Sequence, residues 1–427
     1  MKQFLLLVIL AGLCIIISSC KKDNPVVPPI EPPVTLKDTL TLSVEQVTHR
    51  SIVVNVKTTV NNPNSTVELY RQFNSLDTLV TEYPITIQDT IITDDNNGND
   101  LQLNTEYKYY AVRIDSAGGK KDTSNIITTK TLAATSFNYT WQEFTIGDPG
   151  SVLYDVWGTD ENNVYACGRV GLNDTVYGII RWNGNTWSPE EKVGGLLSIY
   201  GFSETNIWVV GSRVLHYDGS EWEDYTYRNP VITGGITYYS VWGTSSTNLY
   251  FGSGGGKIIH WNGTSAEIVY TNPENVYVND LNGYSADYII GVGTGMVPPL
   301  LAVYYDGNSW NSLPISSNTA LNAVSIVTEN ETYFAGDGIF KMKRGVFSNI
   351  FNSGYYVWDI EYDKQTGITV ASGDFDGVYI NNGLQWENLR GQITSDNTSY
   401  VGIYLTNNTI FCVGSTINEA KIIIGKN

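Results

Sequence analysis

Hydrophobic and polar residues alternate in short runs along much of the chain, and polar turns separate these runs. Clear examples are Ser51–Lys57 (SIVVNVK), Ser65–Arg71 (STVELYR) and the ten residues 103–112 (LNTEYKYYAV). A period of two places successive side chains on opposite faces of an extended backbone, so each run predicts a half-buried β-strand. The pattern as a whole predicts an all-β protein.

From residue 136 onward, one unit of four predicted strands recurs. Its first strand ends at a glycine, and these glycines lie 43, 42 and 40 residues apart, at Gly158, Gly201, Gly243 and Gly283. A turn with an asparagine leads to a second strand that also ends at glycine, as in residues 164–168 (VYACG) and 207–211 (IWVVG). The third strand enters an Asn-Gly or Asp-Gly turn ahead of a tryptophan. Such turns supply the two positive φ angles of a tight hairpin, so the third and fourth strands are predicted to pair.

Later copies of the unit are more divergent but keep the same order. They begin near Val324, Val357 and Val401, and the last copy stops after its third strand. Thr140–Glu143 (TWQE), ahead of the first full copy, is suited to supply the missing fourth strand. Four strands per copy and closure by a terminal strand are typical of a β-propeller, and the copies predict seven blades, with six as the alternative. The repeats resemble propellers of the VWG…N-x-W-x-x-G…DG…W kind, common in secreted bacterial proteins, and this resemblance covers residues 136–427.

Residues 35–132 predict a separate immunoglobulin-like sandwich ahead of the propeller. The strand at 103–112 resembles the tyrosine-corner strand of fibronectin type III domains, with Leu103 and Tyr107 at the expected places. Ser124-Asn125 followed by Thr128-Thr129 resembles the closing strand of the same domain. The resemblance implies a structural role for Tyr107, whose hydroxyl would bond back to the main chain.

One polar loop in this domain allows two interpretations. Asp94–Asp100 (DDNNGND) alternates carboxylates and amides around a glycine, as a calcium loop does, but it lacks the closing bidentate glutamate of an EF-hand. We interpret it as a solvated hairpin loop built from turn-forming residues.

The first 34 residues read as an export and anchoring segment. Lys2 precedes an apolar run from Phe4 to Ile17, and Ile17–Cys20 (ISSC) resembles a bacterial lipobox. The resemblance implies a signal peptide at 1–19 and a lipid on Cys20, with a proline-rich tether over 20–34. A signal-anchor helix is the alternative, but the apolar run is shorter than the roughly 20 residues that span a bilayer. The charged residues after Cys20 resemble those of surface lipoproteins, which predicts the outer membrane, on its surface or periplasmic side.

Composition supports this assignment and excludes one class of partner. The chain is 12% aromatic and has 41 glycines against 14 prolines, which suits a β-protein rich in turns. A net charge of −18 argues against nucleic acid, because phosphate binding needs a cationic surface.

Two cysteines lie in the predicted propeller, Cys167 and Cys412, on corresponding strands of the first and last repeats. The middle strands of neighbouring sheets lie about 10 Å apart, which exceeds the usual reach of a disulfide. We therefore expect buried free thiols, with a disulfide as the alternative in an oxidising compartment.

The residues that most resemble catalytic or binding groups recur with the repeat. Because tryptophans occupy one position in successive copies, we expect packing between blades instead of a sugar-stacking ladder; they are Trp187, Trp222, Trp310 and Trp386. His216 and His260 also fall at matching positions, which predicts a scaffold role, and His49 is isolated in the first domain. No nucleophile–histidine set and no metal-ligand cluster can be assembled, so neither a cofactor nor a metal is expected.

A sialidase is the enzymatic propeller most relevant to exclude. Residues 218–222 (DGSEW) resemble its Asp-box, Ser-x-Asp-x-Gly-x-x-Trp, only superficially, because the glycine directly follows the aspartate and the tryptophan comes sooner. The sequence does not exclude the paired carboxylates of another glycosidase, because the distance between two such groups depends on the three-dimensional structure.

Loop lengths indicate where a ligand would bind. The first-to-second and third-to-fourth strand turns are short and uniform, whereas the second-to-third and blade-to-blade loops vary, and these two sets lie on opposite faces of a propeller. The variable loops include residues 169–177, 225–239, 270–277 and 293–299. Variable loops on a rigid scaffold commonly carry binding sites, and tyrosine and arginine are frequent contact residues. The predicted ligand-binding residues are Tyr225, Tyr227, Arg228, Tyr238, Tyr239 and Arg169. The alternative is that these tyrosines are half-buried within a long loop.

Together these observations predict a monomeric, membrane-anchored binding or scaffold protein outside the cytoplasm, and not an enzyme. Its partner would be a protein or a glycan at the loop-rich propeller face, and only the N-terminal lipid would touch the membrane. The alternatives are a glycan-cleaving enzyme and a structural subunit of an envelope complex.

Overall fold

The computed structural model describes residues 39–427, except 60–63, 86–88, 116–117, 234, 295–299 and 316–319. The predicted signal peptide, Cys20, the tether and most of the predicted loop 293–299 lie outside the described residues. No helix in the described part of the chain is long and apolar enough to cross a membrane.

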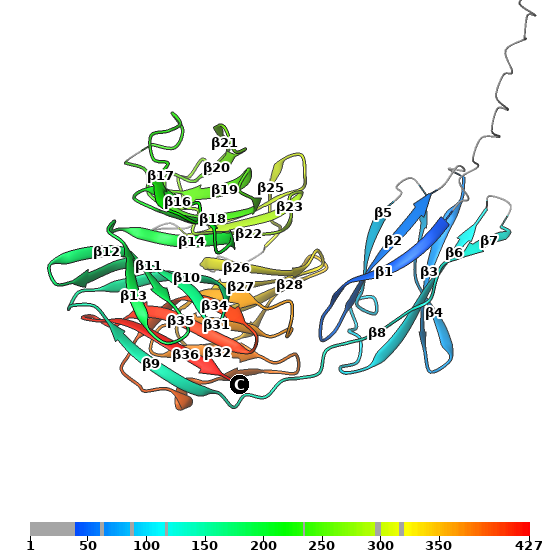
Figure 1. The fold of residues 1–427 in the computed structure, drawn as a ribbon. Coiled ribbons are helices and arrows are strands. Elements are labelled where there is room, and N and C mark those ends of the chain that lie inside the picture. Colours follow the sequence, from blue (N-terminus) through cyan, green and yellow to red (C-terminus); the bar gives the residue numbers. More distant parts are fainter. Residues whose placement is uncertain are drawn as a thin grey trace, which may run out of the picture. The chain divides into compact units, whose positions relative to one another are not determined.

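The first described domain is a two-layer antiparallel sandwich (Figure 1). One layer is formed by β1 (Thr39–Val47), β2 (Ile52–Thr59) and β5 (Asp89–Asp94). The other contains β4 (Leu76–Pro84), β3 (Thr66–Phe73), β6 (Glu106–Ile114), β7 (Lys120–Thr123) and β8 (Ile127–Lys130). The inward positions of the alternating runs form its core, as in Val54, Leu69 and Tyr109, which are fully buried.

Tyr107 makes the contact expected of a tyrosine corner. It is buried, and its hydroxyl accepts a hydrogen bond from the main-chain N–H of Gln102 at 3.0 Å. The leucine in the core is Leu101, which is 3% exposed, whereas Leu103 is only partly buried. The prediction therefore chose the wrong leucine, because residues two apart share the same face of an extended chain and the pattern allowed either.

Among the residues that the structure describes, seven four-stranded antiparallel sheets follow the sandwich. The first three are β10 (Val152–Asp160), β11 (Asn163–Leu172), β12 (Thr175–Trp182) and β13 (Trp187–Glu191); β14 (Leu196–Ser203), β15 (Asn206–Gly211), β16 (Val214–Tyr217) and β17 (Trp222–Asp224); and β18 (Tyr238–Ser245), β19 (Asn248–Ser253), β20 (Lys257–Trp261) and β21 (Ala266–Thr271). The next three are β22 (Asp280–Ser285), β23 (Tyr288–Gly293), β24 (Leu301–Tyr305) and β25 (Trp310–Ser312); β26 (Leu321–Thr328), β27 (Glu331–Gly336), β28 (Gly338–Lys343) and β29 (Val346–Phe351); and β30 (Val357–Tyr362), β31 (Thr369–Gly373), β32 (Gly377–Asn381) and β33 (Trp386–Asn388).

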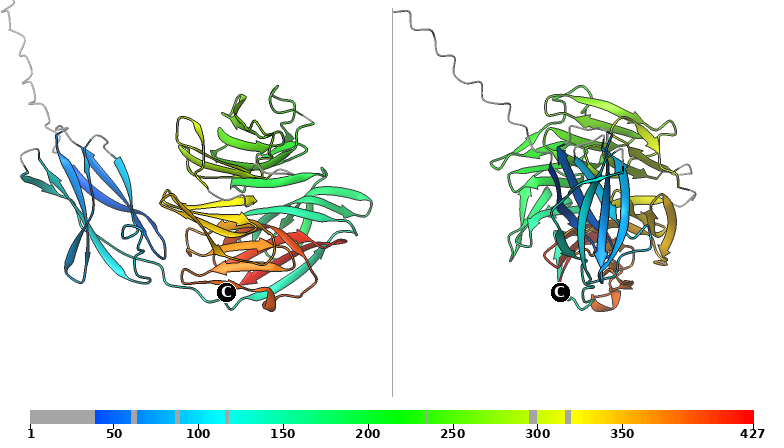
Figure 2. Two further views of the ribbon diagram at one scale, coloured as in Figure 1. Left: turned by 180° about the vertical axis from the view of Figure 1, so that it is seen from behind. Right: turned by 90° about the vertical axis from the view of Figure 1, so that its right-hand side faces the viewer.

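The last sheet joins the two ends of the repeat region. It consists of β34 (Ser399–Thr406), β35 (Thr409–Ser415), β36 (Ala420–Lys426) and β9 (Thr140–Ile146). β9 pairs antiparallel with β36, as predicted for Thr140–Glu143, and Figures 1 and 2 show the two strands side by side. The first strand of each sheet contacts the first strand of the next, and β34 contacts β10, so the ring of sheets is closed.

Contacts between neighbouring first strands explain the glycine of the repeat. A Cβ added to Gly201 would lie 2.5 Å from the ring of Trp157, and one on Gly283 would lie 2.2 Å from the ring of Trp242. In both cases the tryptophan belongs to the preceding sheet. At these two positions the first strand ends with glycine because an aromatic ring from the neighbouring sheet lies on the backbone, whereas at Gly243 the closest atoms belong to the next strand of its own sheet.

The antiparallel order gives the ring two different faces. The first-to-second and third-to-fourth strand turns lie at one end of every sheet, which we call the turn face. The second-to-third loops and the connections between sheets lie at the other end, the loop face. The contacts that join the sandwich to the fifth and sixth propeller sheets lie on the turn face. In one of them, Gln46 donates from Nε2 to the carbonyl of Val327 at 2.9 Å.

The acidic loop Asp94–Asp100 is part of this junction, which corrects its interpretation as a solvated hairpin loop. Asp94 and Asp95 are 3% and 2% exposed. Asp94 accepts hydrogen bonds from Arg71 at 2.8 Å and from the Tyr109 hydroxyl at 2.8 Å. Asp95 accepts from Nε of Arg344 on the propeller at 2.8 Å, and Asp100 pairs with Lys343. Partners distant in sequence bury the two aspartates at the start of the loop, and no local pattern could reveal them. The tip, from Asn97 to Asn99, is exposed, so the interpretation as a solvated loop holds there.

His49 is also part of the junction, so its assignment as an isolated residue was wrong. It is 4% exposed, and its Nε2 donates to the carbonyl of Ala133 at 3.0 Å. Its ring fills a hollow over two propeller glycines: a Cβ on Gly383 would lie 2.1 Å from it, and one on Gly367 2.7 Å. Both glycines also have positive φ, so turn geometry and close approach require the same residue.

Candidate binding face

Exposed aromatic side chains gather on the loop face. Five described Tyr, Phe or Trp side chains are more than one-third exposed: Tyr154, Tyr227, Tyr277, Tyr355 and Phe375. Tyr154 lies near the start of β10, and the other four lie in connections between sheets or between second and third strands. All five therefore belong to the loop face. Large exposed side chains elsewhere, such as Val346 and Leu384 on the turn face, are aliphatic.

Two of the predicted ligand-binding tyrosines pack into the scaffold. Tyr238 is fully buried, and its hydroxyl accepts from the N–H of Thr233 at 3.2 Å. Tyr225 packs edge-on against Trp208 and Trp261 with ring centroids 5.0 and 6.0 Å apart. Here the alternative interpretation was correct, because the long loop supplies aromatic side chains to its own core.

The neighbouring residues Tyr227 and Arg228 both lie on the surface, but only Arg228 is held by contacts with other side chains. Tyr227 is 72% exposed and adopts a φ of 72°, the left-handed region that non-glycine residues seldom occupy. Arg228 lies over the Tyr225 ring at 4.4 Å and donates to both carboxylate oxygens of Glu223, at 2.8 and 3.2 Å. This hydrogen bonding lowers the pKa of Glu223. Tyr227 is thus free for contact, whereas the guanidinium of Arg228 already has a partner.

The two remaining predicted ligand-binding residues, Tyr239 and Arg169, lie in different parts of the loop face. Tyr239 stacks on Tyr277 with centroids 5.2 Å apart, so two predicted loops meet in one aromatic pair. Arg169 is exposed and donates to the carbonyl of Gly150 at 3.3 Å. It belongs to the first propeller sheet, and none of the contacts among the described residues joins it to the tyrosines of the loop 225–239.

A second aromatic group on the loop face was missed. Tyr355 and Phe375 lie 4.7 Å apart, and Tyr356 packs against Trp358 at 4.6 Å. The indole of Trp358 donates to Asp374 at 2.8 Å. A signal was present in the sequence: the Tyr355-Tyr356 pair lies directly ahead of β30, in a connection between two sheets, as the tyrosines of the loop 225–239 lie ahead of or at the start of β18.

This second group has a built-in support. Phe375 and Asp376 both have positive φ, which forms a tight turn that exposes the Phe375 ring. Asp376 is fully buried and accepts from the N–H of Thr398 at 2.8 Å and from the Ser395 hydroxyl at 3.0 Å. The carboxylate thus fixes the neighbouring loop 389–398, and the exposed rings lie on a rigid base.

Acidic side chains line the first strands of the ring, beneath the loop face. Asp155, Asp280 and Asp359 each accept one hydrogen bond from the next residue of their own strand and one from the first strand of the following sheet. The three bonds to the neighbouring sheet are 2.8 to 2.9 Å long. These carboxylates therefore join adjacent sheets. Burial raises the pKa of Asp155 to about 7 and that of Asp280 to about 6.

Glu361 differs from these three. Burial, followed by the charge of Asp359, raises its pKa, and its Oε2 has no hydrogen-bond partner among the described residues. The described residues contain no group of three or more His, Cys, Asp or Glu side chains arranged to hold a metal.

The repeated histidines are scaffold residues, as predicted. Each donates from Nε2 to an asparagine at the start of the preceding strand: His216 to Asn206 at 2.9 Å and His260 to Asn248 at 2.7 Å. Each also stacks on an aromatic ring of that strand. In the first sheet Arg181 takes the same place, donating to Asn163 at 3.0 Å.

The repeated tryptophans pack between sheets, as predicted. Trp310 contacts Tyr250 of the preceding sheet at 6.2 Å, and Trp386 contacts Tyr333 at 5.9 Å. Trp187 and Trp222 pack against clusters that two neighbouring sheets share. The predicted burial of Cys167 is confirmed, as is that of Cys412, and both thiols are free. Burial raises the pKa of both thiols.

Comparison with known proteins identifies the fold. No family model and no curated protein matches the sequence. Among solved structures, YCF48 bound to D1 peptide matches with a TM-score of 0.53 and 13% identity, over 69% of this chain and 100% of that one. The WD40 propeller domain of Doa1 matches at 0.51 and 17% identity, over 68% of this chain and 98% of the other. YCF48 from Cyanidioschyzon merolae matches at 0.50 and 14% identity, over 67% and 98%. At this identity the likeness shows the fold alone: the chain contains a β-propeller.

Proposed function

We propose that this protein is a non-catalytic binding scaffold that recognises a segment of another protein through the loop face of its propeller. The observation that carries the proposal is the location of all five exposed aromatic side chains of the described chain on that face. Tyrosine and phenylalanine provide large contact areas with few rotatable bonds, and they are common at binding sites. One propeller of similar fold is described as bound to a peptide, which agrees with this use of the architecture.

The finer features of the proposal come from the sequence and the strand order. The first domain is of the fibronectin type III kind, and the propeller has seven blades, the last closed by β9. The lipobox at Ile17–Cys20 places a lipid on Cys20, so the protein is anchored in the bacterial envelope, in the outer membrane, and acts outside the cytoplasm. The sandwich would then be a spacer between the membrane and the propeller.

A glycan-cleaving enzyme is the main competing function. Carboxyl groups with raised pKa beside the central axis are what such an enzyme would use. However, Asp155, Asp280 and Asp359 each accept two main-chain hydrogen bonds, which fits a structural role. Of these four carboxylates in the described first strands, only Glu361 keeps an unpartnered oxygen. A Glu361→Gln variant that lost hydrolysis of an envelope glycan would support the enzyme.

A purely structural envelope subunit would instead need a broad apolar patch. The aromatic residues of the loop face are mostly tyrosines, which suits contacts of mixed polarity.

The proposal is tested by capture from an envelope extract and on a glycan array, with the soluble form that starts at Lys21. The test variant carries Tyr227→Ala, Tyr277→Ala, Tyr355→Ala and Phe375→Ala. The control carries Val346→Ala and Leu384→Ala, which remove exposed side chains from the turn face. A protein captured by the wild type and the control, but not by the test variant, supports the proposal. Capture by all three forms contradicts it, and retention on a glycan would change the class of ligand.

A further inference from the structure

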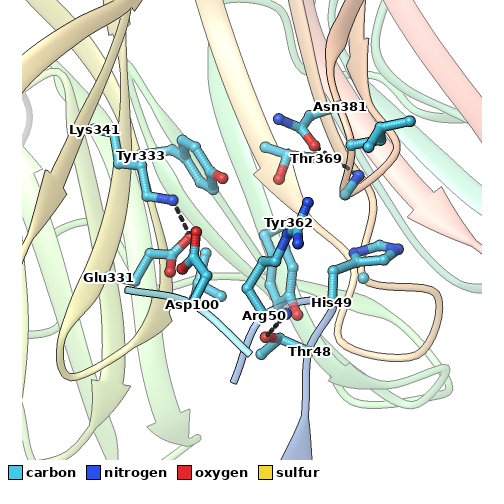
Figure 3. Close-up of a pocket in the computed structure, with 14 residues that line it drawn as sticks. Thr48, His49, Arg50, Asp100, Glu331, Tyr333, Lys341, Tyr362, Thr369 and Asn381 are labelled. Atoms are coloured by element: carbon cyan, nitrogen blue, oxygen red, sulfur yellow. Dashed lines mark hydrogen bonds and ion pairs between the residues drawn. The ribbon is translucent and has the colours of Figure 1, made fainter. Parts of the chain in front are cut away.

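A polar cavity lies where the sandwich meets the turn face, on the opposite side of the ring from the aromatic residues. Its volume is about 200 Å³. Thr48, His49, Arg50 and Asp100 line it from the sandwich, and Glu331, Tyr333, Lys341, Tyr362, Thr369 and Asn381 are among its propeller residues (Figure 3). Because a water molecule occupies about 30 Å³ in the liquid, this space holds a small organic molecule.

The cavity contains one cation whose side chain has no partner among the described residues. Lys341 pairs with Glu331 at 2.6 Å, and Lys343, beside the cavity, pairs with Asp100. Both acids of the lining therefore already have a lysine partner. The main chain of Arg50 is hydrogen-bonded to Thr48 and Leu101, but its guanidinium forms no hydrogen bond or ion pair with the described chain. Figure 3 shows this guanidinium among the lining residues, between Thr369 and His49.

A second polar group in the cavity is also without a partner. The hydroxyl of Tyr362 is buried and forms no hydrogen bond with a described residue. The enclosed hydroxyl is out of reach of a ligand, whereas Arg50 is only partly buried and its guanidinium is open to one. Arg50 is therefore the free donor that this cavity offers to a molecule from outside the chain.

The chemistry of the lining selects the ligand. A guanidinium offers two parallel N–H donors that match the two oxygens of a carboxylate. With both acids paired to lysines, one uncompensated positive charge remains, which suits a monoanion better than a dianion. We propose that this cavity binds a small monocarboxylic acid, with the guanidinium of Arg50 holding the carboxylate.

The shape of the junction supports a ligand site beside it. His49 is fixed over Gly367 and Gly383, and Arg344 of the propeller holds Asp95 of the sandwich. Arg50 follows His49 directly in the chain, so the same contact that joins the domains positions the guanidinium. A bound acid would touch both domains and would add to the stability of their junction.

The test is a set of ligand-observed NMR titrations at pH 7 with acetate, lactate, acetamide and inorganic phosphate. Acetamide has nearly the shape of acetate without its charge, and phosphate, a mixture of monoanion and dianion at pH 7, is the probe of higher mean charge. We expect acetate and lactate to bind the wild-type chain, with lactate the tighter because its hydroxyl adds a hydrogen bond. We expect acetamide and phosphate to bind at least tenfold more weakly.

Three variants localise the binding. Arg50→Gln should weaken acetate binding at least tenfold. Tyr362→Phe should bind acetate like the wild type, because the hydroxyl it removes is enclosed and does not reach the ligand. Lys57→Gln removes one charge from the exposed ion pair with Asp89 in the same domain and should bind like the wild type. Equal binding of acetate and acetamide, tighter binding of phosphate, unchanged binding by Arg50→Gln, or no binding at all would overturn the proposal.

Discussion

The two faces of the propeller are made by the same repeat but are used differently. On the turn face, short uniform turns hold fixed glycines, and the sandwich packs against two neighbouring sheets through buried charges and a histidine. On the loop face, connections vary in length and expose aromatic rings to solvent. The comparison shows that a repeat constrains one end of each sheet through hairpin geometry and leaves the other end free to diverge. Divergence and exposed aromatic area coincide, which is the reason for our proposal that a partner binds there.

The largest loss of stability is expected at a glycine whose lack of a side chain lets two neighbouring sheets pack together. Gly283→Ala would place a Cβ 2.2 Å from the Trp242 ring, so neighbouring first strands would have to separate. We expect a loss of about 3 kcal/mol in the free energy of unfolding. Chemical denaturation measures it. Gly391→Ala is the control, because its Cβ would meet no atom within 4 Å, and an equal loss in both variants would contradict the packing argument.

The next effect concerns the turn face. Arg344→Ala would leave the carboxylate of Asp95, which is 2% exposed, without its propeller partner. Because Arg344 itself is 39% exposed, solvent screening limits the loss to about 1 to 2 kcal/mol. Hydrogen exchange in Asp94–Asp100 should increase. Lys57→Ala, in an exposed pair, should leave that exchange unchanged, and no change in either variant would mean that this ion pair does not hold the junction.

A smaller effect is expected from pH, through the carboxylates that join the sheets. The pKa values of Asp155 and Asp280 are raised by burial to about 7 and about 6, from about 3.9 in an unfolded chain. The folded state therefore binds more protons between about pH 4 and 7, and its stability falls as the pH rises through that window. The melting temperature should be several degrees lower at pH 8 than at pH 5.5.

Two variants separate this effect from general charge repulsion. Asp155→Asn removes one titrating group from the ring and should reduce the change in melting temperature between pH 5.5 and 8. Asp218→Asn removes a carboxyl from an exposed turn whose pKa is lowered to about 2 by hydrogen bonds, chiefly from the Ser220 hydroxyl. This variant should keep the full change. A melting temperature that rises with pH would contradict the assignment.

The smallest expected effect on stability is on the loop face. Tyr227→Ala removes a side chain that is 72% exposed and is not part of the core. The free energy of unfolding should therefore change by less than about 0.5 kcal/mol. Tyr238→Phe, by comparison, removes a buried hydroxyl bonded to Thr233 and should cost about 1 kcal/mol. Equal costs in the two variants would show that exposure does not separate contact residues from scaffold residues here.

The sequence was most informative at positions that recur in successive copies of the repeat. Gly158 and its counterparts, the Asp-Gly turns and the strand at Thr140 all predicted local structure that depends on neighbours within one repeat or the next. Periodicity also identified His216 and His260 as scaffold residues.

The sequence was least informative where distant segments meet. The prediction could not distinguish buried Tyr238 from exposed Tyr227, because both lie in one loop and their exposure depends on the core formed with Trp208 and Trp261. Asp95 and His49 read as polar loop residues, but propeller residues more than 200 positions away bury them. The contact between Tyr355 and Phe375 was missed because the two rings come from different loops, and only the folded chain brings them together.

Site-specific photo-crosslinking in intact cells tests the central claim most directly. A benzophenone amino acid would replace Tyr355 on the loop face in one strain and Val346 on the turn face in another, both exposed positions. Our account predicts a discrete protein adduct from position 355 and none from position 346. An adduct from position 346 alone, or from neither position, would contradict the assignment of the loop face as the binding face.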